Sequence, residues 1–235
     1  MDVDSAMIDV QTPGGAMPAQ LARPGGDAPL PAVIVIQEAF GLNGHIKGVA
    51  RRLAAEGYVT LAPDLFHRGG AGRVAGYDQL PEALRLMGEL TDAGIVEDVG
   101  SGVAYLERQP FVRADHVGIT GFCMGGRVSY LVACALPAKI KAAVPFYGGG
   151  IPIDRTPTLQ APVLAFFGAD DAFIPLDQVR ALEEEAKRRG KSLETVVYPN
   201  APHGFFCDER DSYRPDAARD AWERLKAFFA RHLQA

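Results

Sequence analysis

Hydrophobic positions along this chain fall into two alternating patterns: short continuous apolar runs, and longer segments with helical spacing. The run AVIVIQ at 32–37 has no polar alternation, as expected for a parallel strand covered on both faces. Two further runs flank Thr12-Pro13-Gly14-Gly15, which predicts an N-terminal antiparallel hairpin closed by a glycine turn. Other short β-branched or aromatic runs bring the prediction to about eight strands; they lie at 58–62, 116–120, 143–147, 163–167 and 193–198.

The segments between these runs have the amphipathic spacing of helices. They lie at 46–56, 81–91, 95–108, 124–135, 176–189 and 215–233. Alternation of strands and helices favours an α/β fold with a mostly parallel, doubly wound sheet flanked by helices. No repeat or change in composition marks an internal boundary, so we expect a single domain over 1–235. The glycine-rich segment 67–78 predicts a flexible loop at the rim.

Charge and the start of the chain bound its location and partners. The formal net charge is -5 and the basic residues are scattered, which argues against a nucleic-acid partner. The opening MDVDSAMIDV has neither a basic start nor a long apolar stretch, which predicts no signal peptide and no membrane anchor. We therefore expect a cytoplasmic protein. Charged helix faces such as EEEAKRRGK at 183–191 favour a monomer.

Cysteine and histidine spacing gives no indication of a metal site. The 3 cysteines include no Cys-x-x-Cys pair, which argues against a zinc cluster and a disulfide framework. The 5 histidines show no spacing of the His-Glu-x-x-His kind. We expect free thiols, no metal and no cofactor.

One cysteine occupies a position typical of a catalytic nucleophile. Gly121-Phe122-Cys123-Met124-Gly125 matches the pattern Gly-x-nucleophile-x-Gly, in which the nucleophile lies on a strained turn between a strand and a helix. A predicted strand precedes Cys123 and a predicted helix follows it. The unpaired amides and dipole at the start of that helix favour a thiolate. The alternative, a small buried residue in a tight turn, is the interpretation we keep for Cys134 and Cys207.

An acid and a histidine follow this cysteine in the order that such a site requires. The predicted strand 163–167 leads into ADDAFIP, where Asp171 is the predicted acid and Asp170 competes with it. The frame from Gly168 to Pro175 favours Asp171. The last predicted strand leads into PNAPHGF and places His203 at the same sheet edge. We expect His203 to take the proton of the thiol, and Asp171 to fix the tautomer of the imidazole.

The sequence resembles the dienelactone hydrolases, or carboxymethylenebutenolidases, of the α/β-hydrolase superfamily. The resemblance runs from about Ala32 to the C-terminus and rests on six motifs together: QEAFGLN at 37–43, APDLF at 62–66, GFCMGG at 121–126, FYGGG at 146–150, GADDAFIP at 168–175 and PHGFF at 202–206. It implies hydrolysis of a small ester or lactone by Cys123, His203 and Asp171 through an acyl-thioester intermediate. A thioesterase, a general esterase, a peptidase or a non-catalytic ligand-binding homologue are the alternatives.

The resemblance also implies roles for other residues. Glu38 would bond the resting thiol until substrate binding displaces it. The backbone amides of Ala39 and Met124 would form the oxyanion hole. The predicted pocket residues are Phe40, Arg85, Tyr147 and Phe206, and Arg127 would brace the loop or bond Glu38. The family's arginine clamp for a substrate carboxylate is not matched here; the candidate arginines are Arg68, Arg73, Arg85 and Arg210.

Overall fold

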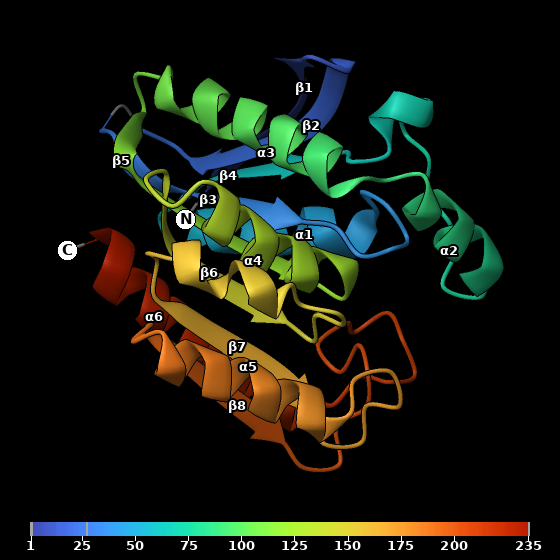
Figure 1. The fold of residues 1–235 in the computed structure, drawn as a ribbon. Helices are drawn as coiled ribbons and strands as arrows, with labels where there is room; N and C mark the ends of the chain where they lie inside the picture. The colour runs from blue at the N-terminus through green and yellow to red at the C-terminus, as the bar shows by residue number, and fades with distance from the viewer. Residues whose placement is uncertain (1, 27, 235) are drawn as a thin grey trace. The chain divides into compact units, whose positions relative to one another are not determined.

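A computed structural model describes residues 2–26 and 28–234 of the chain (Figure 1). The described strands are β1 (Val3–Thr12), β2 (Gly15–Pro24), β3 (Leu30–Ile36), β4 (Val59–Pro63), β5 (Val112–Phe122), β6 (Ile140–Phe146), β7 (Val163–Gly168) and β8 (Leu193–Tyr198). The described α-helices are α1 (Gly44–Ala55), α2 (Leu80–Gly88), α3 (Asp92–Glu107), α4 (Met124–Ala135), α5 (Leu176–Arg188) and α6 (Pro215–Phe229). Short helical turns are η1 (His67–Gly69), η2 (Ile153–Thr158) and η3 (Ala230–Gln234).

The strands form an eight-stranded sheet in the order β1-β2-β4-β3-β5-β6-β7-β8. The pairs β3-β4, β6-β7 and β7-β8 are parallel, whereas β1-β2 and β2-β4 are antiparallel. The α/β fold and the mostly parallel sheet that the sequence predicts are therefore confirmed. The chain divides into two compact units, a first unit that ends at Gly118 and a second unit that begins at Ile119. A single domain stays a prediction.

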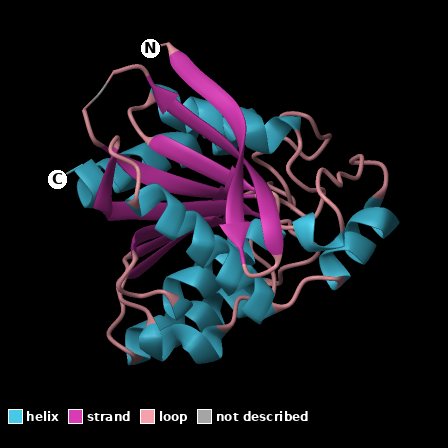
Figure 2. Cartoon of the chain, turned by 90° about the horizontal axis from the view of Figure 1, so that it is seen from above, coloured by secondary structure: helices cyan, strands magenta, loops and turns pink. Residues whose placement is uncertain are grey.

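The first unit begins with the hairpin that the sequence predicts. β1 pairs with β2 along its whole length, and Figure 2 shows the first of these strands running from the N-terminus. Thr12 closes the turn, because its Oγ1 donates to the carbonyl of Gly15 at 2.9 Å and accepts from the amide of Gly14 at 3.0 Å. β3 and β4 then pair in parallel, with every residue of β4 buried.

The first helix starts at an asparagine cap. The side-chain Oδ1 of Asn43 accepts a hydrogen bond from the amide of Ile46 at 3.1 Å, which satisfies one of the free amides at the start of α1. One face of α1 buries Ile46, Val49 and Leu53, and the helix contacts β2 and β4. Hydrophobic burial of this face positions the loop that precedes the helix, residues 37–43.

The second unit is built around a cluster of aromatic side chains. The ring of Phe146 on β6 lies 4.7 Å from Phe122, 4.7 Å from Phe166 and 4.9 Å from Phe206, measured between ring centroids. All four side chains are buried. Rings of this size contribute most of the apolar area of a small core, so the cluster fixes the ends of β5, β6 and β7, from which the site residues project.

The two largest boundary differences from the sequence predictions are in β5 and α6. β5 begins at Val112, four residues before the predicted start at 116, because exposed polar positions such as Asp115 hide the strand pattern. α6 ends at Phe229 and the chain continues as the π-type turn η3, where one helix was predicted to Leu233. Among the described residues, no helix has the length and apolar character needed to span a bilayer.

Candidate active site

Cys123 lies on the turn between β5 and α4, in a strained backbone conformation. Its φ of 56° is positive, which is unfavourable for a residue with a side chain. Backbone hydrogen bonds hold the turn: the amide of Cys123 donates to the carbonyl of Phe146 at 3.1 Å, and the amide of Gly126 donates to the carbonyl of Cys123 at 2.9 Å. The thiol therefore projects at the start of α4, where the helix dipole stabilises negative charge.

Two glycines let the first turn of α4 approach the end of β6. A Cβ atom added to Gly126 would lie 2.3 Å from the carbonyl oxygen of Phe146, and one added to Gly148 would lie 2.6 Å from the amide nitrogen of Arg127. No side chain fits at either position. The pattern around Cys123 pointed to Gly121 and Gly125 and not to this contact, although the repeated glycines in GFCMGG and FYGGG were a signal for it.

The loop after β7 supplies Asp171, and both of its carboxylate oxygens are engaged. Oδ1 accepts hydrogen bonds from the amides of Phe173 at 2.8 Å and Ile174 at 3.1 Å, and Oδ2 lies 2.8 Å from Nδ1 of His203. The side chain of Asp171 is 1% exposed. Asp170, its competitor in the sequence, is exposed. The structure therefore brings Asp171 to the imidazole.

The loops that carry Asp171 and His203 are in direct contact. A Cβ atom on Gly168, the last residue of β7, would lie 2.1 Å from the carbonyl oxygen of Ala201. That carbonyl also accepts a hydrogen bond from the amide of Asp170 at 3.1 Å. The turn before His203 includes Asn200 at a positive φ of 55°. Close backbone packing therefore fixes the separation between the carboxylate and the imidazole.

His203 connects the acid to the thiol. Burial by itself lowers the pKa of His203, but hydrogen bonds to Asp171 and Cys123, together with the charges of these groups, outweigh it and raise the pKa to about 9. Since Nδ1 faces Asp171, the other ring nitrogen, Nε2, is the one available to the thiol. Cys123, His203 and Asp171, far apart in the sequence, thus form a connected group within the second unit.

Two aromatic rings flank the imidazole. Tyr147 contacts it edge-on at 5.1 Å and is fully buried, with a positive φ of 34°. Phe173 contacts it edge-on at 5.3 Å and is 66% exposed. Tyr147 was a predicted pocket residue. Phe173 was not, because its only signal in the sequence is an aromatic residue between the acid and the proline of ADDAFIP. Phe206, predicted for the pocket, lies in the aromatic core, 2% exposed.

Glu38 and its neighbours belong to the first unit and lie on the loop before α1. Glu38 is fully buried, and the hydroxyl of Tyr77 donates to its Oε2 at 3.2 Å. Ala39 is 4% exposed, and the ring of Phe40 contacts that of Tyr77 edge-on at 4.8 Å. The roles of Glu38 toward the thiol and of the Ala39 and Met124 amides toward an oxyanion stay predictions.

The candidate arginines of the first unit are paired with acidic side chains. Arg85 is exposed on α2 and forms ion pairs with Glu82 and Glu89, each at 2.6 Å. Arg73 also pairs with Glu89, at 2.5 Å. Arg68 pairs with Asp98 and Glu97, each at 2.9 Å. A substrate carboxylate would have to compete with these partners.

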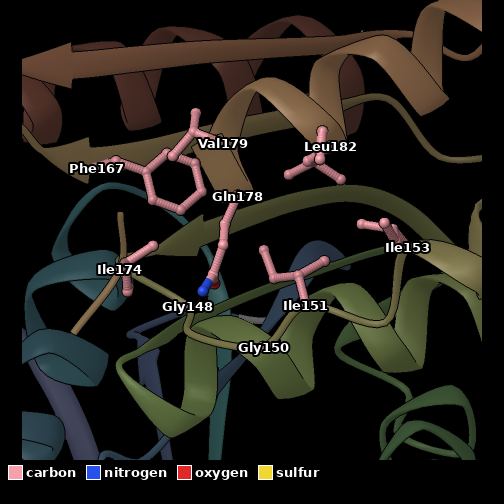
Figure 3. A pocket seen from close by; sticks show the side chains of 10 residues that line it. Gly148, Gly150, Ile151, Ile153, Phe167, Ile174, Gln178, Val179 and Leu182 are labelled. Carbon is pink, nitrogen blue, oxygen red and sulfur yellow. The ribbon is translucent and has the colours of Figure 1, made fainter. Parts of the chain in front are cut away.

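An apolar cavity of about 280 Å³ lies next to the acid loop in the second unit (Figure 3). Aliphatic and aromatic side chains of α5, β7 and the loop after β6 line it, among them Ile151, Phe167, Ile174 and Leu182. The amide of Ile174 donates to Asp171, so one cavity wall also supports the acid. Among the described residues, no group of three or more histidine, cysteine and acidic side chains is placed to hold a metal ion.

Comparisons with known proteins agree with one another. A sequence model of the dienelactone hydrolase family matches residues 17–233. A Synechocystis protein, provisionally named carboxymethylenebutenolidase, is 36% identical over 248 aligned positions that cover 100% of this chain and 99% of that protein. A Bradyrhizobium protein, provisionally named 2-oxo-3-(5-oxofuran-2-ylidene)propanoate lactonase, is 34% identical. The alignment covers 96% of this chain and 94% of that protein. A Klebsiella pneumoniae crystal structure, provisionally described as a dienelactone hydrolase, has 37% identity and a TM-score of 0.92, covering 99% of this chain and 100% of that one.

Proposed function

Because the chain belongs to the dienelactone hydrolase family, we propose that it hydrolyses a small carboxylic ester or lactone with Cys123 as the nucleophile. The observation that carries the proposal is the hydrogen-bonded connection from the Cys123 thiol through His203 to Asp171. The names of two relatives support a lactone as the proposed substrate, since one is named a carboxymethylenebutenolidase and the other a lactonase.

The chemistry begins with transfer of the thiol proton to Nε2 of His203, and Sγ then attacks the acyl carbon of the substrate. The carbonyl oxygen becomes an oxyanion, which the amide of Met124 at the start of α4 and the amide of Ala39 are proposed to stabilise. When the oxyanion collapses, the carbon–oxygen bond breaks and the leaving oxygen takes the proton from His203. The product of this half-reaction is an acyl-thioester on Cys123.

Hydrolysis of the thioester completes the cycle. His203 takes a proton from water as the water oxygen attacks the thioester carbon. The carbon–sulfur bond then breaks, which releases the carboxylic acid, and the sulfur takes the proton back from His203. Asp171 stabilises the imidazolium in both halves, because its Oδ2 accepts from Nδ1 while its Oδ1 is fixed by two amides. Glu38 is proposed to bond the thiol at rest, which would keep the sulfur protonated and resistant to oxidation until substrate arrives.

A nucleophile variant tests the proposal. Cys123→Ala removes the sulfur, and we expect hydrolysis of a short-chain aryl ester to fall by at least about 1,000-fold, as for other nucleophile deletions. Cys134→Ala is the matched control, because Cys134 is buried on the apolar face of α4. Unchanged turnover in Cys123→Ala would reject the assignment. Running aryl esters, thioesters and lactones with and without a carboxylate beside this variant would identify the substrate class.

Thiol labelling separates an enzyme from a ligand-binding homologue without catalysis. We expect iodoacetamide to modify Cys123 fastest, because Cys123 is partly exposed and His203 accepts its proton whenever Glu38 releases the thiol. Burial raises the pKa of the Cys134 thiol to about 12, and Cys207 is fully buried, so both should react slowly. Mass spectrometry of peptides after timed labelling measures the three rates. Equal, slow modification of all three cysteines would favour the binding protein.

A further inference from the structure

A tyrosine outside the predicted site holds the buried carboxylate of Glu38. Tyr77 belongs to the loop between η1 and α2, and its hydroxyl lies 3.2 Å from Oε2 of Glu38, which is fully buried. We propose that Tyr77 is a positioning residue that assigns the two oxygens of Glu38 different tasks, so that Oε1 is the oxygen that takes up and releases a proton in the proposed role of Glu38. This inference rests on the proposed function and deepens it.

The direction of the hydrogen bonds follows from the cap of α1. Oδ1 of Asn43 accepts from the amide of Ile46 at 3.1 Å, so its Nδ2 must face the other way. Nδ2 lies 3.0 Å from the hydroxyl oxygen of Tyr77, and as an amide nitrogen it can only donate. The hydroxyl oxygen of Tyr77 accepts this hydrogen bond from Asn43, and the single proton of the hydroxyl is donated to Glu38.

The consequence concerns the two oxygens of the carboxylate. Oε2 already accepts the proton of Tyr77, and this charge-assisted hydrogen bond favours the ionised carboxylate. The hydrogen bond occupies one lone pair of Oε2 and makes Oε2 the less basic of the two oxygens. Oε1 is therefore the oxygen that accepts or releases a proton when the thiol changes state.

Packing and loop contacts hold the ring of Tyr77 in place independently of its hydroxyl. It packs edge-on against Phe40 at 4.8 Å, and the amide of Ala75 donates to the carbonyl of Phe40 at 3.0 Å. A Cβ atom on Gly41 would lie 2.5 Å from the carbonyl oxygen of Arg73, so the two loops approach each other closely. Loss of the hydroxyl alone would leave this packing in place.

Tyr77→Phe tests the inference, because it removes only the hydroxyl. We expect kcat/KM to fall about tenfold to a hundredfold, the range for a hydrogen bond to a charged group. We also expect the acidic limb of the kcat/KM profile to move to higher pH, because the lost donor had favoured the ionised carboxylate. Tyr105→Phe on α3 is the matched control and should leave both quantities unchanged.

Variants of Asn43 separate capping from orientation. Serine caps helices about as well as asparagine, but its side chain is too short to cap α1 and reach Tyr77 at once. Asn43→Ser should therefore shift the pH profile in the same direction as Tyr77→Phe while α1 stays intact by circular dichroism. The double variant Asn43→Ser with Tyr77→Phe should behave like Tyr77→Phe alone, since both act through one hydroxyl. Additive shifts would contradict this chain of hydrogen bonds.

Two outcomes would overturn the inference. One is a Tyr77→Phe variant whose pH profile matches the wild type, whatever its rate, because a merely structural tyrosine would lower activity without moving the profile. The other is a full pH shift by Tyr77→Phe in a Glu38→Gln background, where no carboxylate remains to titrate. Failure of the proposed function is distinguishable, since it would appear as turnover that survives in Cys123→Ala.

Discussion

The two oxygens of the Asp171 carboxylate have different hydrogen-bond partners. Oδ1 is held by the amides of Phe173 and Ile174, and Oδ2 faces His203. This division explains why Asp171 and not its neighbour Asp170 reaches the imidazole, since only one of two adjacent side chains can face the interior of the loop. The sequence frame from Gly168 to Pro175 favoured the same residue, but it contained no information about the two amides.

Asp171→Asn should therefore disable the proton relay. The amide cannot hold Nδ1–H as the carboxylate does, so the imidazole loses its required tautomer and kcat should fall by about 10,000-fold. The pKa of His203, now raised to about 9, should also fall because the charge that favours the imidazolium is gone. The limb of the pH profile that His203 sets should therefore move to lower pH, which a pH–rate profile of the remaining activity measures. Asp170→Asn is the control; a larger loss there would contradict the assignment.

Elements defined by local pattern were predictable, and contacts between distant segments were not. The sequence predicted α4 at 124–135 and β8 at 193–198 with the bounds that the structure has, because apolar spacing and turn residues act locally. The close approach of Gly126 to Gly148 depends on two elements meeting. The same holds for the hydrogen bond from Tyr77 to Glu38, which joins positions 39 residues apart. The repeated glycines were a signal for the first contact but do not say which segments meet, and spacing within one segment carries no signal for the second.

Alanine substitution should have opposite effects on stability at two helical glycines, because only Gly126 lies where α4 approaches the end of β6. Gly126→Ala would place a methyl group against the carbonyl of Phe146, and we expect a loss of about 1–3 kcal/mol in the free energy of unfolding, with lower activity as the Cys123 turn shifts. Gly48→Ala in α1 meets nothing closer than 4.0 Å and should gain about 0.5–1 kcal/mol. Urea denaturation measures both; equal effects would refute the packing argument.

For the molecule as a whole, His203 links stability to pH. Its pKa is raised to about 9 in the folded protein from an ordinary value of 6.5, so the folded state binds this proton more tightly than the unfolded state. The resulting stabilisation is fully present below pH 6.5 and is lost as the pH rises through 9. Its size is on the order of 3 kcal/mol. Burial lowers the pKa of His232, which acts with the opposite sign and only below pH 6.5.

Denaturation curves at several pH values test this linkage. The wild type should lose stability between pH 6.5 and 9, and His203→Gln should lose much less over the same interval because the titrating group is absent. His116→Gln, a change outside the site, should follow the wild type. Parallel curves for the wild type and His203→Gln would show that the imidazole does not hold its proton as the contacts require.

Asn43 takes part in two structures at once, the cap of α1 and the support of Tyr77. Local opening of the first helical turn should therefore release the hydroxyl of Tyr77 as well, so that local unfolding there would interrupt the proposed role of Glu38 without global unfolding. The hydrogen-exchange rate of the Ile46 amide would then measure how often the hydrogen bond to Asn43 breaks and the support of Tyr77 is lost.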